Sequence, residues 1–117
     1  MRILLDENIP FALRKLLGDH EVKHASEEGW DGLSNGQLIA AAEGAGHDVM
    51  LTADKNLRYQ QNLAMRRLAI MALSTNHWKT IRRDVRLVVE ALERVKPGAF
   101  VELDFSTPRK QRDGDQT

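Results

Sequence analysis

The chain has 117 residues, no cysteine and a formal net charge of zero, and 42% of its residues are hydrophobic while 29% are charged. This length and composition are typical of one globular domain, and the lack of cysteine excludes disulfides, thiolate nucleophiles and thiolate zinc sites. No apolar run is long enough to span a membrane and the N-terminus has no signal-peptide pattern, so we expect a cytoplasmic protein without a membrane partner.

The zero net charge conceals an acidic half followed by a basic segment. Residues 1–54 carry 4 Lys and Arg against 10 Asp and Glu, a net charge of −6. Residues 55–86 carry 8 Lys and Arg against 1 Asp, a net charge of +7. This asymmetry suits metal binding beside a phosphate backbone, although the two parts could equally neutralise each other on folding.

Short apolar runs and helical patterns alternate from the first residues onward. Residues 3–5 are expected to form a strand buried on both faces, residues 8–17 a helix, and residues 21–25 a short strand. Residues 26–35 are a polar loop in which Trp30 either anchors the loop on the core or stacks on a ligand base; we favour the core.

The same alternation continues through the second half of the chain. Ser34 or Asn35 is expected to cap a helix that runs to about residue 44 or 46. The last residues, 106–117, are polar and aperiodic, which predicts a disordered tail. Between them we expect, in order, a strand at 48–52, a helix at 57–67, a strand at 68–73, a helix at 78–95 and a strand at 99–105.

This alternation predicts an α/β protein whose five-stranded sheet is mainly parallel and carries helices on both faces. One standard strand order is 2-1-3-4-5, with its switch point between strands 1 and 3. In that order the carboxyl ends of these two strands lie side by side. Open α/β sheets bind their ligands at such an edge.

Carboxylates follow both of these strands. Asp6 and Glu7 come directly after the first strand, and Asp54 follows the third. Clustered carboxylates without sulfur or paired histidines suit Mg²⁺ or Mn²⁺, which can orient water and clamp phosphate oxygens. Each acid alone could equally be a helix N-cap, but the pair Asp6 and Asp54 at one edge favours a metal site, with Glu7 as a third ligand.

Other polar residues would complete this site. Asn35 and Asn56 could hold a metal-bound water or the substrate, and Lys55 could neutralise a scissile phosphate. Arg58 is grouped with them as a substrate-binding residue.

A basic stripe lies on the last expected helix. Its members recur at helical spacing and are expected to share one face. They could follow a nucleic-acid backbone, or they could simply be a solvated face, which is the more common case. They are Lys79, Arg82, Arg83 and Arg86.

Two segments, ILLDENIP at residues 3–10 and LTADKNL at residues 51–57, resemble PIN-like proteins. The nearest group is the small bacterial type regarded as toxin components of toxin–antitoxin pairs. The resemblance covers residues 1–105 as one PIN-like domain and implies a three-layer α/β/α sandwich. It further implies a Mg²⁺- or Mn²⁺-dependent endoribonuclease with an RNA substrate, a cognate antitoxin protein that blocks the site, and frequently a homodimer.

The resemblance also assigns residues to this activity. Asp6 matches the first metal-binding acid and Asp54 the acid after the third strand. Asn56 and the stretch 34–37 offer no acid where many such nucleases carry one, which leaves Glu7 as the extra carboxylate. Three hypotheses follow: a metal-dependent ribonuclease, a catalytically weakened module that binds RNA or a partner protein, and a phosphate-handling enzyme on the same fold.

Overall fold

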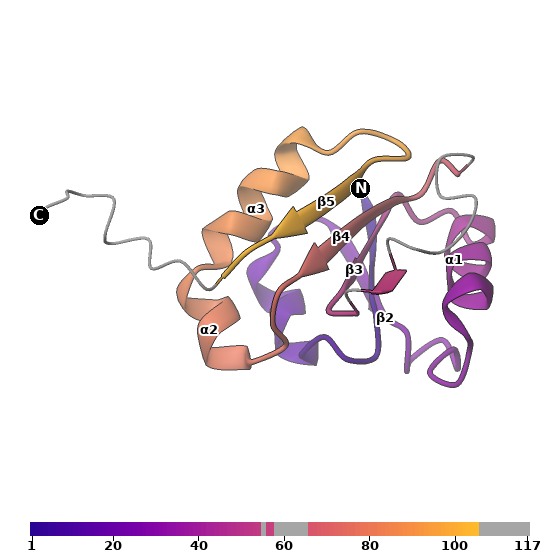
Figure 1. Cartoon of the computed structure of the whole chain (residues 1–117), viewed down its shortest axis with the longest axis horizontal. Helices are drawn as coiled ribbons and strands as arrows, with labels where there is room; N and C mark the ends of the chain where they lie inside the picture. The colour runs from indigo at the N-terminus through magenta and orange to yellow at the C-terminus, as the bar shows by residue number, and fades with distance from the viewer. Residues whose placement is uncertain (55, 58–65, 106–117) are drawn as a thin grey trace, which may run out of the picture.

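Five short strands form one sheet in which every neighbouring pair is parallel (Figure 1). This computed structural model describes residues 1–54, 56–57 and 66–105. The strand order is β2-β1-β3-β4-β5, so the predicted parallel sheet and its predicted order are both confirmed. The strands are β1 (Arg2–Leu5), β2 (Glu21–His24), β3 (Val49–Thr52), β4 (Ala69–Leu73) and β5 (Phe100–Leu103).

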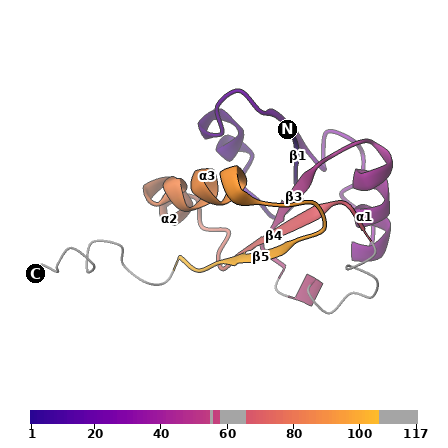
Figure 2. The ribbon, with the colours of Figure 1, turned by 90° about the horizontal axis from the view of Figure 1, so that it is seen from above.

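The central strands are apolar because both of their faces are covered. Every residue of β3 and β4 is buried, and so is every residue of β1 after Arg2. One face packs against η1 (Phe11–Leu16), α2 (Trp78–Arg83) and α3 (Val85–Arg94), and the other packs against α1 (Asn35–Gly44). Figure 2 shows α3 and α1 on opposite sides of the strands.

The first helix differs from its prediction. Residues 8–17 were expected to be one helix, whereas the structure has a short 3-10 helix, η1, that starts only at Phe11. Pro10 has extended backbone angles (φ −57°, ψ 129°), and a residue that precedes proline is also pushed out of the helical region. The chain therefore turns after β1, where the Ile9 N–H donates to the Asp6 carbonyl at 2.9 Å.

The last long helix is broken in two. Residues 78–95 were expected to be continuous, but Asp84 leaves the helical region (φ −113°, ψ 34°) and separates α2 from α3. Aspartate competes with helical hydrogen bonding through its short side chain. The expected basic stripe is consequently divided: Lys79, Arg82 and Arg83 lie on α2, and Arg86 lies on α3.

Two further predictions concern loops and caps. Ser34 caps α1 in a reciprocal box with Gln37, which confirms the predicted start of that helix. Trp30 packs against the core cluster on the α1 face, so its interpretation as a core anchor is confirmed.

The helix predicted at 57–67 lies largely outside the described residues, and the predicted tail at 106–117 lies wholly outside them. Each helix within the described residues falls short of the length and apolarity that a membrane span requires.

Gly98 turns the chain between α3 and β5. Its φ is +78°, and a Cβ built there would stand 2.7 Å from the Arg66 carbonyl oxygen. Gly98→Ala is therefore expected to lower the free energy of unfolding by about 2–4 kcal/mol, through backbone strain plus overpacking. Urea denaturation measures this loss.

Gly18→Ala is the matched control for this prediction. Gly18 has a similar φ of +69° but nothing within 4 Å of its built Cβ, so its substitution measures the backbone strain alone. Equal losses in the two variants would show that the contact with Arg66 contributes nothing.

Glu43, near the end of α1, holds the segment that enters β4. Its Oε2 accepts from the Arg67 N–H at 2.6 Å and the Leu68 N–H at 3.3 Å, and its Oε1 accepts from the Arg66 side chain at 3.0 Å. These bonds, above all the one from the Arg67 N–H, hold the pKa of Glu43 below its usual value of 4.5. The stabilisation is thus complete above that pH and is lost as the pH falls through the lowered pKa.

Glu43→Gln is expected to cost about 1–2 kcal/mol of unfolding free energy at pH 7. The difference between wild type and variant should shrink as the pH falls below 4.5, because acid neutralises the wild-type carboxylate. Urea denaturation from pH 7 to pH 3 measures it, with the exposed Glu93→Gln as the control. A difference that stays constant over this range would contradict the assigned role.

Candidate functional site

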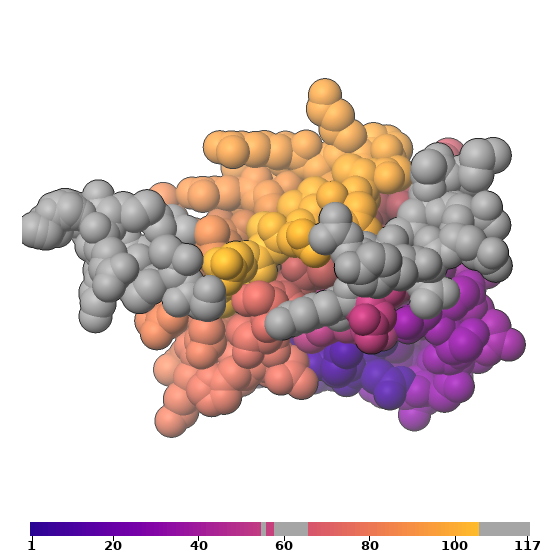
Figure 3. Space-filling view, viewed as in Figure 1, coloured from indigo at the N-terminus to yellow at the C-terminus, as the bar shows by residue number. Residues whose placement is uncertain are grey.

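The site predicted at the carboxyl edge of the sheet is built on β1 and β3. These strands are neighbours in register, with Leu5 paired to Leu51, so Asp6 and Thr52 stand opposite each other. The Asp6 N–H extends the pairing by donating to the Leu51 carbonyl at 2.9 Å. In Figure 3 the indigo surface of the N-terminal segment lies beside the magenta surface of the segment that follows β3.

The carboxylate of Asp6 is buried and firmly held. Asp6 is 6% exposed. Its Oδ1 accepts from the Glu7 N–H at 2.7 Å, and its Oδ2 accepts from the Thr52 hydroxyl at 2.7 Å. Each oxygen thus has one donor recorded among the described residues and can accept further from a cation or a water.

Thr52 connects the two predicted acids. The residue is fully buried, and its hydroxyl donates to Asp6 while it accepts from the Asp54 N–H at 3.0 Å. Sequence reasoning did not single out this residue. The available signal was that it precedes Asp54 by two residues on a buried strand, which places it on the same face of the sheet.

Asp54 is half-buried and makes two kinds of contact. Its Oδ1 accepts from the Asn56 N–H at 2.9 Å, the capping interaction that was the alternative interpretation of this acid. Its Oδ2 accepts from the Asn35 side-chain amide at 2.9 Å. Asn35 is the first residue of α1, so this bond ties the helix to the end of β3.

The turns after β1 and β3 are also joined directly. The Asn8 side-chain oxygen accepts from the Ala53 N–H at 3.3 Å. Asn8 was assigned only to a helix start by sequence, and the structure instead gives it this cross-link.

The other predicted site residues are exposed or lie outside the described residues. Glu7 is exposed beside Asp6, and Asn56 is exposed and engages Asp54 through its backbone. Lys55 and Arg58 lie outside the described residues. The structure therefore brings together Asp6, Asp54 and Asn35.

The same edge continues across β4 to β5. Because Thr52 pairs with Ala72 and Ala72 pairs with Glu102, one cross-strand row runs from Asp6 to Glu102. A hollow of about 200 Å³ beside it is lined by residues that include Ser74, Glu102 and Asp104. Sequence reasoning did not associate β5 with the site. Hollows of about 370 and 480 Å³ lie elsewhere, the first lined by Met1, His47 and Asp48 among others and the second between α3 and β5.

The donor set suits one class of metal. No group of three or more His, Asp or Glu side chains that could hold a metal ion occurs among the described residues. Mg²⁺, however, is commonly held by one or two carboxylates, with water and substrate phosphates as its other ligands. Asp6 and Asp54, each with oxygens able to accept further, fit such a site.

Comparisons with protein-family models, with curated proteins and with solved structures found no match to this chain. The class of the protein therefore follows from its own fold and site. It is a parallel α/β protein with linked carboxylate, hydroxyl and amide groups at the carboxyl edge of β1 and β3.

Proposed function

We propose that this protein is a Mg²⁺- or Mn²⁺-dependent ribonuclease with a PIN-like domain arranged as a three-layer α/β/α sandwich. The observation that carries the proposal is the link from Asp6 through Thr52 to Asp54, two acids separated by 48 positions in sequence. A role as the toxin component of a toxin–antitoxin pair, a cognate antitoxin that covers the site and a homodimer belong to the same proposal.

The side chains of the edge have distinct roles in this proposal. Asp6 and Asp54 hold the metal, which supplies charge to stabilise the phosphodiester oxygens and lowers the pKa of water when it is bound. Thr52 and Asn35 each donate a hydrogen bond that fixes the orientation of one carboxylate. The exposed Glu7 lies next to Asp6, where it can bind a water at the rim.

Exposed basic residues near this edge support a nucleic-acid substrate. Four residues separate the end of β4 from the start of α2, and α2 contacts η1. Arg83 pairs with Asp84 at 3.2 Å and Arg86 with Glu90 at 3.5 Å, which leaves Lys79 and Arg82 as the basic residues of α2 without an ion pair among the described residues. Phosphate contacts of this kind contribute affinity without sequence preference.

The first test is Mn²⁺ binding by calorimetry, followed by cleavage of single-stranded RNA with and without the metal. We expect metal binding and metal-dependent cleavage. Lys79→Ala with Arg82→Ala should raise KM about tenfold and make cleavage less sensitive to salt. The matched control is Arg94→Ala with Lys96→Ala, which removes the same charge from the end of α3 and should leave KM unchanged.

Other outcomes point to the remaining hypotheses. RNA binding without cleavage would favour a module that binds RNA or a partner protein. A site with only two carboxylates is also compatible with such a non-catalytic function. Cleavage of a small phosphoester but not of RNA would favour a phosphate-handling enzyme. Absence of Mn²⁺ binding at millimolar metal would overturn the nuclease proposal.

A further inference from the structure

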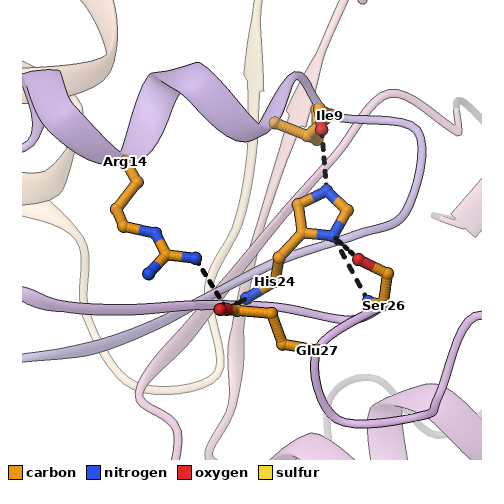
Figure 4. Close-up of polar contacts among 5 residues, drawn as sticks. All are labelled: Ile9, Arg14, His24, Ser26 and Glu27. Carbon is orange, nitrogen blue, oxygen red and sulfur yellow. Dashed lines mark hydrogen bonds and ion pairs between the residues drawn. The ribbon is translucent and has the colours of Figure 1, made fainter.

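His24, the last residue of β2, is buried against the turn that follows β1 (Figure 4). It is 6% exposed, and the proposed function gives it no part. Its Nε2 lies 2.9 Å from the Ile9 carbonyl oxygen. On the other side of the ring, Nδ1 lies 2.8 Å from the Ser26 hydroxyl and 3.2 Å from the Ser26 N–H.

These contacts fix the tautomer of the ring. The Ser26 N–H can only donate, so Nδ1 must accept and the ring proton must be on Nε2. Nε2 then donates to the Ile9 carbonyl. The ring thus bridges the end of β2 to the turn after β1.

The ring and its backbone are themselves held in place. The Phe11 ring packs against it with centroids 5.2 Å apart, and Arg14 lies 4.1 Å above the Phe11 ring. Arg14 pairs with Glu27 at 2.7 Å, and Glu27 in turn accepts from the His24 N–H at 2.9 Å. The closed set of contacts leaves the His24 ring little freedom to move away from Ile9.

The turn that His24 fastens is the one that carries Asp6. The Ile9 N–H donates back to the Asp6 carbonyl, so residues 6–9 form a closed turn whose far end is the Ile9 peptide. Inside this turn the Glu7 N–H donates to the Asp6 carboxylate, and Asn8 accepts from Ala53. Displacing Ile9 would therefore disturb both the Asp6 carboxylate and the link to β3.

We propose that His24 is a positioning residue for the Asp6 carboxylate, acting through the bond from its Nε2–H to the Ile9 carbonyl. The ordering of the turn stands on the contacts above, whereas its effect on metal binding rests on the proposed function. The two parts are therefore tested by separate measurements on the same variants.

The test compares His24→Gln with His24→Asn. The side-chain amide of glutamine reaches the position of Nε2 and can donate to Ile9, whereas the shorter asparagine cannot. Without metal, the amides of Glu7 and Ala53 are expected to exchange with solvent about tenfold faster in His24→Asn and within about threefold of wild type in His24→Gln. Mn²⁺ affinity should fall about 10- to 100-fold in His24→Asn only.

Each outcome decides one part of the proposal. Wild-type exchange at Glu7 and Ala53 in His24→Asn would overturn it, and so would equal losses in both variants, since a merely structural role would not be rescued by glutamine. Failure of the wild type to bind Mn²⁺ would overturn the proposed function and leave the exchange result standing. If His24→Asn does not fold, Phe11→Leu removes the ring contact at a half-exposed position. Unchanged exchange at Glu7 in that variant would overturn the proposal as well.

Discussion

Asp6→Asn is expected to lower Mn²⁺ affinity at least about 100-fold and to remove metal-dependent RNA cleavage. The substitution removes one of the two carboxylates that hold the cation. Asp54 alone supplies too little negative charge to hold the cation as tightly. It also places an amide N–H₂ where the carboxylate now accepts from Glu7 or from Thr52. That mismatch is expected to cost about 1–3 kcal/mol of unfolding free energy.

Asp54→Asn should reduce Mn²⁺ affinity as strongly with a smaller loss of stability. Asp54 is half-buried, and an asparagine can still cap the turn at Asn56 with its oxygen. Calorimetry at a fixed pH, together with urea denaturation of each variant, separates metal binding from folding.

Asp19→Asn is the charge-matched control, since Asp19 is exposed on the turn before β2. Its Mn²⁺ affinity should equal that of wild type. Retention of metal by either Asp6→Asn or Asp54→Asn would show that the two acids do not share one site.

Much of the sheet could be predicted because its strands obey simple rules. Short apolar runs of three to five residues, such as 3–5 and 69–73, are buried on both faces only in a parallel sheet covered by helices. Right-handed crossovers and the usual doubly wound order then place the end of β1 beside β3. From this order alone, Asp6 and Asp54 could be predicted to lie at one edge.

The parts that could not be predicted depend on individual backbone angles and single hydrogen bonds. The apolar period of residues 78–95 is compatible with one helix, and nothing in that period shows that Asp84 leaves the helical region. The position of η1 depends on the turn at Ile9 and Pro10, where steric restriction overrides the helical pattern of the residues that follow.

The residues that hydrogen-bond to the two acids could not be predicted from the sequence for a related reason. From the sequence, Thr52 is one more strand residue and Asn8 is the start of a helix. Only the hydrogen bonds show that each side chain contacts the turn after the neighbouring strand. His24 reads as part of a weak alternation, and its role depends on a carbonyl 15 positions earlier. Residue type and spacing therefore located the edge but not the contacts that hold it.

Thr52→Val is expected to show whether the link between the two acids holds the edge together. Valine has nearly the same shape, so the fully buried position keeps its packing and loses only the hydroxyl. The Asp6 carboxylate then lacks one donor and the Asp54 N–H lacks its acceptor, which is expected to cost about 2–4 kcal/mol of unfolding free energy. Mn²⁺ affinity should fall about 10- to 100-fold, since Thr52 orients a carboxylate that binds the metal.

Thr52→Ser separates the hydroxyl from the methyl group. Serine keeps both hydrogen bonds and leaves a methyl-sized gap, for which we expect a loss of about 1 kcal/mol and Mn²⁺ affinity within about threefold of wild type. Urea denaturation and calorimetry on the three proteins give the comparison. If the serine variant were the less stable of the two, packing of the methyl group would be the main contribution of Thr52, and the two acids would be held at this edge by the register of β1 and β3 rather than by the hydroxyl.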